Sequence, residues 1–156
     1  MDSKLDSGPG LNFPPPTVYC VGFIIARSLD YFVPIAEFPY FWPRVVVGSL
    51  LLAIGILACW WAMTIFRKHD TGLMPNTRAT DLVRIGPYRY SRNPMYVTLF
   101  IQYIGISLAL GSIWAFILIP VVFLFVRWIV VREEQYLADE FGDSYKQFTS
   151  EVRRWL

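Results

Sequence analysis

A dense group of polar and aromatic side chains lies between residues 86 and 96, where the sequence reads GPYRYSRNPMY. It combines a Gly-Pro turn, three tyrosines, two arginines and an Asn-Pro step directly before a long apolar run. Local structure alone explains Asn93 and Pro94, because Asn is a good helix cap and Pro is favoured in the first helical turn. It does not explain the arginines and tyrosines, although anchoring at a membrane interface accounts for each singly. This stretch is therefore the first candidate for a binding site.

A second polar group, Arg132, Glu133 and Glu134, follows the last apolar run of the chain. Adjacent carboxylates at the end of a helix are often only a solvated surface. Here both groups fall at the same end of two antiparallel helices joined by a tight turn, so we expect them to be neighbours in space. A pocket with carboxylates, arginines and tyrosines suits a zwitterionic, partly cationic ligand. We therefore interpret the two groups as parts of one site.

Four apolar runs must position these groups, and they span residues 17–33, 44–66, 94–110 and 113–131. The last two runs share a stretch, residues 93–126, that carries no charged side chain. At about 1.5 Å per residue, a single helix of that length would far exceed a hydrocarbon core about 30 Å thick. We therefore expect a hairpin that turns at Gly111 and Ser112, with Pro120 kinking its second arm.

The composition agrees with a membrane location, because 55% of the 156 residues are hydrophobic and 17% are aromatic, more than a soluble domain of this size can bury. The predicted fold class is all-α, a polytopic membrane protein with about four transmembrane helices. A cytoplasmic loop and short C-terminal helices, one over residues 133–141 and one from Ser144, are expected to cover a cofactor pocket. We expect residues 1–16 to form a flexible arm and residues 17–156 to form one membrane-embedded domain.

The basic residues predict the orientation of the chain. Residues 67–93 hold six Lys or Arg and the segment from Arg127 onward holds five, whereas the opposite side has Arg44 and, if it lies near that end, Arg27. By the positive-inside rule, both termini and the polar groups then face the cytoplasm. The formal net charge of +2 is too small to indicate a nucleic-acid partner.

Taken together, several segments resemble the isoprenylcysteine carboxyl methyltransferase family, which is related to the phospholipid N-methyltransferases. The resemblance rests on residues 86–96, the Glu133-Glu134 pair, Leu137, Phe141-Gly142, Tyr145 and the closing VRRW, within about half of the chain. It implies an integral-membrane enzyme that uses S-adenosylmethionine without a Rossmann domain and methylates a lipid or a small apolar acceptor.

The resemblance also implies which residues bind the cofactor: Leu82, Val83, Tyr88, Asn93, Pro94, Met95, Tyr96 and Glu133. In this interpretation Glu133 holds the amino group of the cofactor through a charge-assisted hydrogen bond, and no metal is needed. The candidate catalytic residues are Glu134, as a base for an amine acceptor, and Arg132, as a contact for an acidic one.

Two positions depart from the best-known members of that family. Asn93 stands where they have His, and since Asn cannot titrate near neutral pH we expect no proton transfer there. Ile129 stands where the members that methylate prenylated cysteine have Arg, so recognition of an acceptor carboxylate would fall to Arg127 or Arg132.

Two other classes of function remain open from the sequence. One is an intramembrane NADPH-dependent reductase of related helical core, although such enzymes are much longer. The other is a non-catalytic four-helix membrane scaffold or transporter. Arg27 and Asp30, spaced i, i+3 inside the first apolar run, are expected to form a structural ion pair, but they would also suit a transporter.

Overall fold

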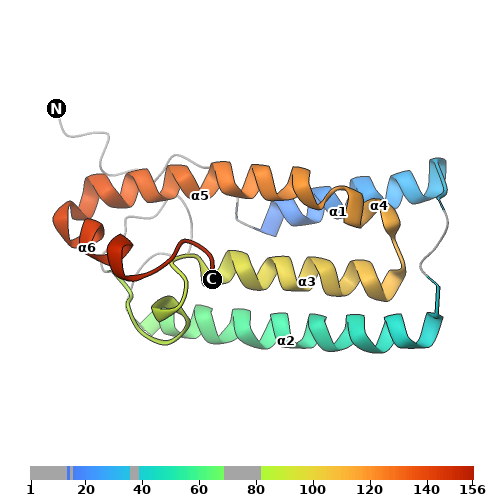
Figure 1. The fold of residues 1–156 in the computed structure, drawn as a ribbon, viewed down its shortest axis with the longest axis horizontal. Helices are drawn as coiled ribbons and strands as arrows, with labels where there is room; N and C mark the ends of the chain where they lie inside the picture. The colour runs from blue at the N-terminus through green and yellow to red at the C-terminus, as the bar shows by residue number, and fades with distance from the viewer. Residues whose placement is uncertain (1–13, 15, 36–38, 69–81) are drawn as a thin grey trace. The chain divides into compact units, whose positions relative to one another are not determined.

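The computed structural model describes residues 14, 16–35, 39–68 and 82–156, and the regular elements within these ranges are all helical (Figure 1). They are α1 (Pro16–Phe32), α2 (Phe41–Lys68), the short 3-10 helix η1 (Gly86–Arg89), α3 (Pro94–Leu110), α4 (Ile113–Ile117), α5 (Ile119–Phe141) and α6 (Asp143–Glu151). The prediction of an all-α fold is confirmed. Most of the expected flexible arm lies outside the described residues.

The second arm of the predicted hairpin differs from expectation in two ways. It is not one kinked helix, because α4 ends at Ile117 and α5 starts at Ile119. Pro120 explains the break, since its ring clashes with the carbonyl four residues earlier and it has no N–H to donate. The expected separate helix over residues 133–141 is also wrong, because α5 continues without interruption to Phe141.

Two boundaries of the other helices follow from local chemistry. Helix α2 begins at Phe41, three residues before the apolar run 44–66, and holds Pro43 in its first turn, where a proline costs no hydrogen bond. At the other end of the chain, α5 ends before Gly142, whose φ of 52° lies in the left-handed region that favours glycine.

The chain divides into two compact units, and α2, α3 and α5 contribute residues to both. We call Pro15–Ala58 with Tyr96–Val126 the apolar unit. We call Met1–Pro14, Cys59–Met95 and Arg127–Leu156 the polar unit.

Within the apolar unit, α2 and α3 approach so closely that their backbones touch. A Cβ added to Gly48 would lie 2.5 Å from the backbone nitrogen of Ala109, and one added to Gly105 would lie 2.7 Å from that of Leu52. Glycine at both positions is thus a requirement of the packing, as at many helix contacts in membranes.

Hydrogen bonds from buried side chains to backbone carbonyls connect the remaining helices of the apolar unit. The hydroxyl of Tyr19 on α1 donates to the carbonyl of Tyr96 on α3 at 3.0 Å, and that of Tyr103 donates to the carbonyl of Ala115 on α4 at 3.1 Å. On the exposed side of α1, Arg27 and Asp30 form the expected ion pair at 2.8 Å.

Among the described helices, α2 is the one long and apolar enough to cross a membrane. It has 28 residues, and its most apolar 18-residue window has a mean hydropathy of 2.3 and is only 17% buried. An apolar surface of this size on a helix is typical of contact with lipid. Helix α3 is apolar but has only 17 residues. One crossing is thus supported by length and composition, and the four predicted crossings stay a prediction.

Candidate functional site

The 86–96 stretch begins with a turn that is fixed against the end of α2. Gly86 has a φ of 59°, and a Cβ at this position would collide with the Cδ1 of Ile65. Tyr88 stacks on Phe66 with ring centroids 5.6 Å apart, and it is buried with Val83 in a cluster that includes Ala62. The sequence Gly-Pro therefore makes a tight turn that only glycine can begin, and the tyrosine holds that turn in place.

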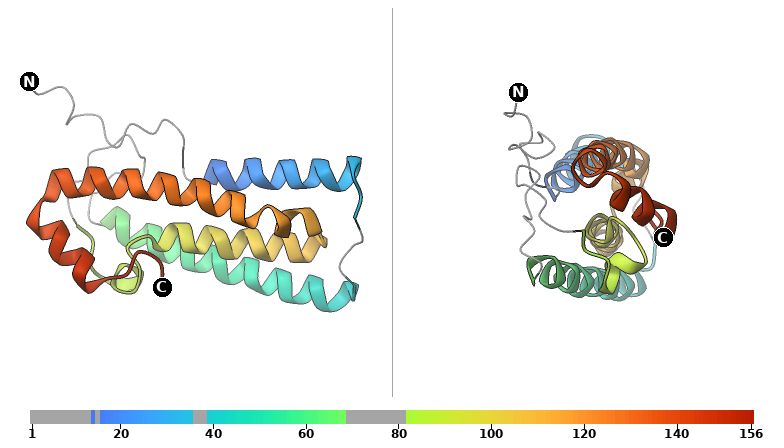
Figure 2. Two further views of the ribbon diagram at one scale, coloured as in Figure 1. Left: turned by 45° about the horizontal axis from the view of Figure 1, so that its top comes forward. Right: turned by 90° about the vertical axis from the view of Figure 1, so that its left-hand side faces the viewer.

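After this turn, residues 91–93 pair with the end of the chain. The backbone N–H of Arg92 donates to the carbonyl of Arg153 at 2.9 Å. The carbonyl of Arg154 accepts from the Ser91 hydroxyl and from the Asn93 side-chain amide, each at 3.2 Å. We call residues 152–156 the C-terminal strap. Both overall views show α6 turning back from the end of α5 so that this strap lies beside the start of α3 (Figures 1 and 2).

Glu134 is the centre of the polar unit. It is buried, with 9% of its surface exposed, and both carboxylate oxygens are in contact with donors. Oε2 accepts from Nε and Nη2 of Arg154 at 3.0 and 2.7 Å. Oε1 lies 3.5 Å from Nη1 of Arg92 and 3.5 Å from Nδ2 of Asn93. We call Arg92, Asn93, Glu134 and Arg154 the Glu134 cluster. A buried carboxylate needs such partners, because burying an unpaired charge is very costly.

The structure therefore brings together the two polar groups that sequence spacing placed at the same ends of two helices. Asn93 comes from the first group and Glu134 from the second. Glu133 is half-buried and has an interaction of its own. Arg132 is exposed, and its guanidinium carbon lies 4.0 Å from the ring centroid of Trp128, a cation–π contact.

The other residues predicted to bind the cofactor lie in different parts of the structure. Leu82 packs against the buried cluster of Tyr145, Phe148 and Val152, whereas the next residue, Val83, belongs to the cluster with Tyr88. Pro94 is the buried first residue of α3, and Met95 packs against the Tyr88 cluster. Tyr96 is buried in the apolar unit, where its carbonyl accepts from Tyr19.

Three contributors to the Glu134 cluster and its surroundings were not among the predicted site residues: Arg92, Arg154 and Tyr145. The hydrogen bond to Glu134 raises the pKa of Arg154 above its ordinary value. Burial raises the pKa of Tyr145 to about 12, and the negative charge of Glu134 adds to this rise while Arg92 opposes it. The closing Arg-Arg pair was visible in the sequence, but its spacing does not say which arginine reaches a carboxylate.

Comparison with known proteins decides the family. The profile described as phospholipid methyltransferase matches residues 43–144, which is more than half of the chain. The chain belongs to the phospholipid methyltransferase family. The matched range contains Asn93, Glu133 and Glu134, but it ends before Arg154 and the rest of the C-terminal strap.

Two individual relatives also match parts of the chain. The chain is 39% identical over 72 residues to Protein-S-isoprenylcysteine O-methyltransferase of Schizosaccharomyces pombe, which is 46% of this chain and 30% of that protein. It is 26% identical over 113 residues to the nickel-cobalt-cadmium resistance protein NccN of Alcaligenes xylosoxydans xylosoxydans, covering 72% of this chain and 51% of that protein. The chain thus spans less than a third of the first relative and about half of the second. No solved structure matches it.

Membership of the phospholipid methyltransferase family agrees with the resemblance noted in residues 86–96 and in the glutamate pair. The family is membrane-associated, which agrees with the exposed apolar surface of α2. Within the matched range, the side chain of Asn93 lies 3.5 Å from that of Glu134, so the segments 86–96 and 132–134 meet at the Glu134 cluster.

Proposed function

We propose that this protein is an S-adenosylmethionine-dependent methyltransferase that acts on a lipid-like or small apolar acceptor. The observation that carries the proposal is the contact between Asn93 and Glu134, which joins the two polar segments of a chain in the phospholipid methyltransferase family. Because the curated relatives are longer than the matched part, this activity is a proposal for the protein and not a property read from them.

The polar unit offers buried groups that suit a zwitterionic cofactor. Among the described residues of the polar unit, four side-chain atoms are buried without a hydrogen-bond partner: the hydroxyl oxygens of Tyr88, Tyr136 and Tyr145 and Nε of Arg92. Each such group costs about 1–3 kcal/mol if it stays unpaired, so a polar ligand that reaches them would be favoured. S-adenosylmethionine carries an amino group, a carboxylate and a sulfonium, and it supplies an electrophilic methyl group.

In the proposed site the two glutamates have different tasks. Glu133 is half-buried and is the carboxylate we assign to the cofactor's amino group, because a charge-assisted hydrogen bond there is strong. Glu134 already accepts from Arg154 on Oε2 and faces Arg92 and Asn93 with Oε1. A carboxylate held in this way is poorly placed to take a proton, so we assign Glu134 to positioning Asn93 and the C-terminal strap.

The acceptor must reach this site from an apolar environment. Arg132 lies exposed in the second half of α5 and is the group we assign to an anionic acceptor. Leu82, Val83, Tyr88, Pro94 and Met95, which all belong to the polar unit, remain the proposed walls of the cofactor pocket. The chain's own contribution to the reaction is then to align the acceptor with the methyl group and to exclude water.

We further propose that α1, α2, α3 and the α4–α5 pair all cross the membrane, with the polar unit on the cytoplasmic side. This proposal rests on the four apolar runs and on the positive-inside rule. It extends the single crossing that length and composition support for α2.

The direct test is calorimetric titration of the detergent-solubilised protein with S-adenosylhomocysteine and, separately, with NADPH. Binding of S-adenosylhomocysteine alone supports the proposal. Binding of NADPH alone would select the reductase, and heat from neither ligand would favour a scaffold or transporter.

The variant Glu133→Ala should weaken S-adenosylhomocysteine binding at least tenfold, because a charge-assisted hydrogen bond is lost while the fold is retained. Asp139→Ala is the matched control, since Asp139 is an exposed carboxylate on the same helix. Wild-type affinity in Glu133→Ala, or an equal loss in the control, would remove Glu133 from the site.

A further inference from the structure

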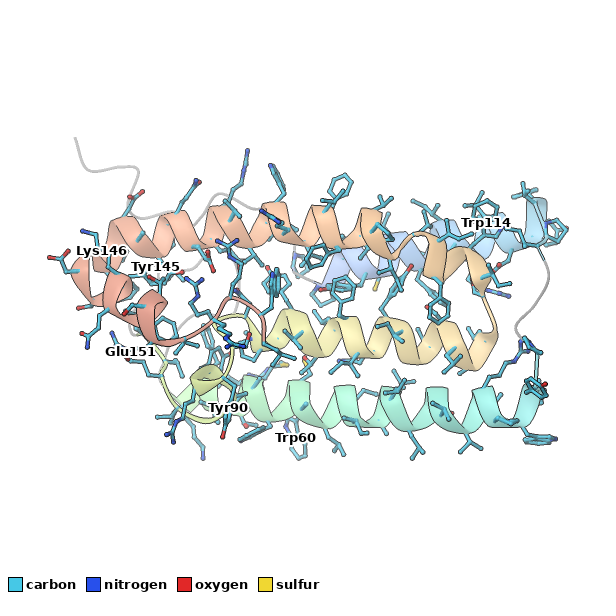
Figure 3. The ribbon with its side chains drawn as sticks, viewed as in Figure 1. Trp60, Tyr90, Trp114, Tyr145, Lys146 and Glu151 are labelled. Carbon is cyan, nitrogen blue, oxygen red and sulfur yellow. The ribbon has the colours of Figure 1, made fainter. Side chains whose placement is uncertain are left out.

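A groove lies between η1 and α6, and its lining shares no residue with the Glu134 cluster. Its larger part has a volume of about 510 Å³ and is lined by Arg84, Arg89, Phe148 and Glu151 together with neighbouring apolar residues. A second part of about 340 Å³ shares Arg89 and Glu151 and extends to Tyr90 and Arg153. We call these two parts the η1–α6 groove. Figure 3 shows Tyr90 after η1 and Glu151 at the end of α6.

Positive charge dominates the η1–α6 groove, because three arginines face one glutamate. Arg84 is held in place by two contacts: Nη2 donates to the carbonyl of Ser144 at 2.8 Å, and its guanidinium carbon lies 5.5 Å from the ring centroid of Phe148. Arg89 is exposed, and Glu151 accepts from the Gln147 side chain at 3.0 Å. A fixed guanidinium beside an exposed one suits an anion with several oxygens, such as a phosphate group.

The position of the groove relative to α2 places it at the depth of lipid headgroups. Gly86, which lines the groove, lies directly against Ile65 in the last turn of α2. One turn earlier, Trp60 and Trp61 are 65% and 51% exposed, and the helix ends with the exposed pair Arg67 and Lys68. Exposed tryptophans followed by basic residues mark the membrane interface on the cytoplasmic side.

The lining is apolar as well as charged. Ile85 and Val152 join Phe148 in the larger part, and Leu156 lines the smaller one. This combination matches a phospholipid, whose phosphate is charged and whose glycerol and acyl chains are increasingly apolar. The excess of arginine over glutamate favours a lipid with net negative charge over a zwitterionic one.

We propose that the η1–α6 groove binds the phosphate group of an anionic membrane phospholipid. The bound lipid is a neighbour that anchors η1 and α6 at the membrane surface, and it is not the methyl acceptor. The groove and the Glu134 cluster have no side chain in common. The lipid site and the proposed methyl transfer can therefore be tested independently.

The test is native mass spectrometry of the purified full-length chain in a neutral detergent, titrated with phosphatidylglycerol, phosphatidylcholine or inorganic phosphate. We expect phosphatidylglycerol to bind about tenfold more tightly than phosphatidylcholine. We expect Arg89→Gln to weaken its binding about fivefold and Glu151→Gln to strengthen it about fivefold, as one charge near a phospholipid phosphate should. Both side chains are exposed, so neither substitution disturbs the core.

Arg127→Gln is the matched control, since Arg127 is an exposed arginine of the polar unit outside the groove. Equal affinities for the two lipids, or an equal effect of Arg89→Gln and Arg127→Gln, would overturn the proposal. Inorganic phosphate that binds as tightly as phosphatidylglycerol would assign the groove to a soluble phosphate instead. Binding of S-adenosylhomocysteine should be unchanged in Arg89→Gln and Glu151→Gln, which separates this site from the proposed function.

Discussion

Each of the two units of this protein is stabilised internally by a different kind of contact. In the apolar unit, glycines bring the backbones of α2 and α3 into contact, and tyrosine hydroxyls donate to backbone carbonyls. In the polar unit, the buried carboxylate of Glu134 contacts two arginines and an amide that come from two other segments. The difference teaches that one fold can rely on close backbone packing in one unit and on charged hydrogen bonds in the other.

The strongest way to break the polar unit is to remove its central carboxylate. Glu134→Ala should lower the free energy of unfolding by about 3–5 kcal/mol, because Arg92 and Arg154 would then face each other without a counter-charge. Thermal unfolding in detergent measures the loss. The double variant Glu134→Ala, Arg154→Ala should recover part of it, and the exposed Asp139→Ala should lose almost nothing. A double variant less stable than Glu134→Ala would contradict the ion-pair account.

The apolar unit should be destabilised most by a larger side chain at the close contact between α2 and α3. Gly48→Val should cost about 3 kcal/mol, because its Cβ would lie 2.5 Å from a backbone nitrogen of α3 and the helices would have to separate. The same unfolding measurement applies. Ala53→Val is the control, since Ala53 lies on the exposed side of the same helix. Equal stability of the two variants would show that the close contact of α2 and α3 is not required.

The smallest expected effect comes from a single neutral hydrogen bond in the apolar unit. Tyr19→Phe removes one neutral hydrogen bond to the carbonyl of Tyr96 and should cost about 1 kcal/mol. Tyr31→Phe, at a side chain that is 81% exposed, should leave the unfolding midpoint unchanged. A loss in Tyr19→Phe as large as that of Glu134→Ala would mean that the two units do not differ in the way described.

Much of the helical organisation could be predicted, because apolar runs and their interruptions report directly on burial and length. The runs 17–33 and 94–110 agree closely with α1 and α3. The break at Leu118 was missed, because a proline within an apolar run can either kink a helix or end it, and the surrounding contacts decide which.

The sequence predicts which segments form the site, but it does not predict which side chains of these segments contact one another. A tight hairpin is enough to bring residue 93 near the glutamate pair. Adjacent residues on a helix point about 100° apart, however, so spacing alone cannot say whether Glu133 or Glu134 faces inward. Arg154 was missed because its partner lies 20 residues away across a turn, and no periodic pattern records that pairing.

The position of the C-terminal strap at the end of the chain also affects the order in which the two units can fold during synthesis. Glu134 leaves the ribosome 20 residues ahead of Arg154, which supplies its closest counter-charge. Until that arginine arrives, the end of α5 carries a carboxylate that is expensive to bury. We therefore expect the polar unit to be the later of the two to reach its final form, because it needs the C-terminal strap to be synthesised first.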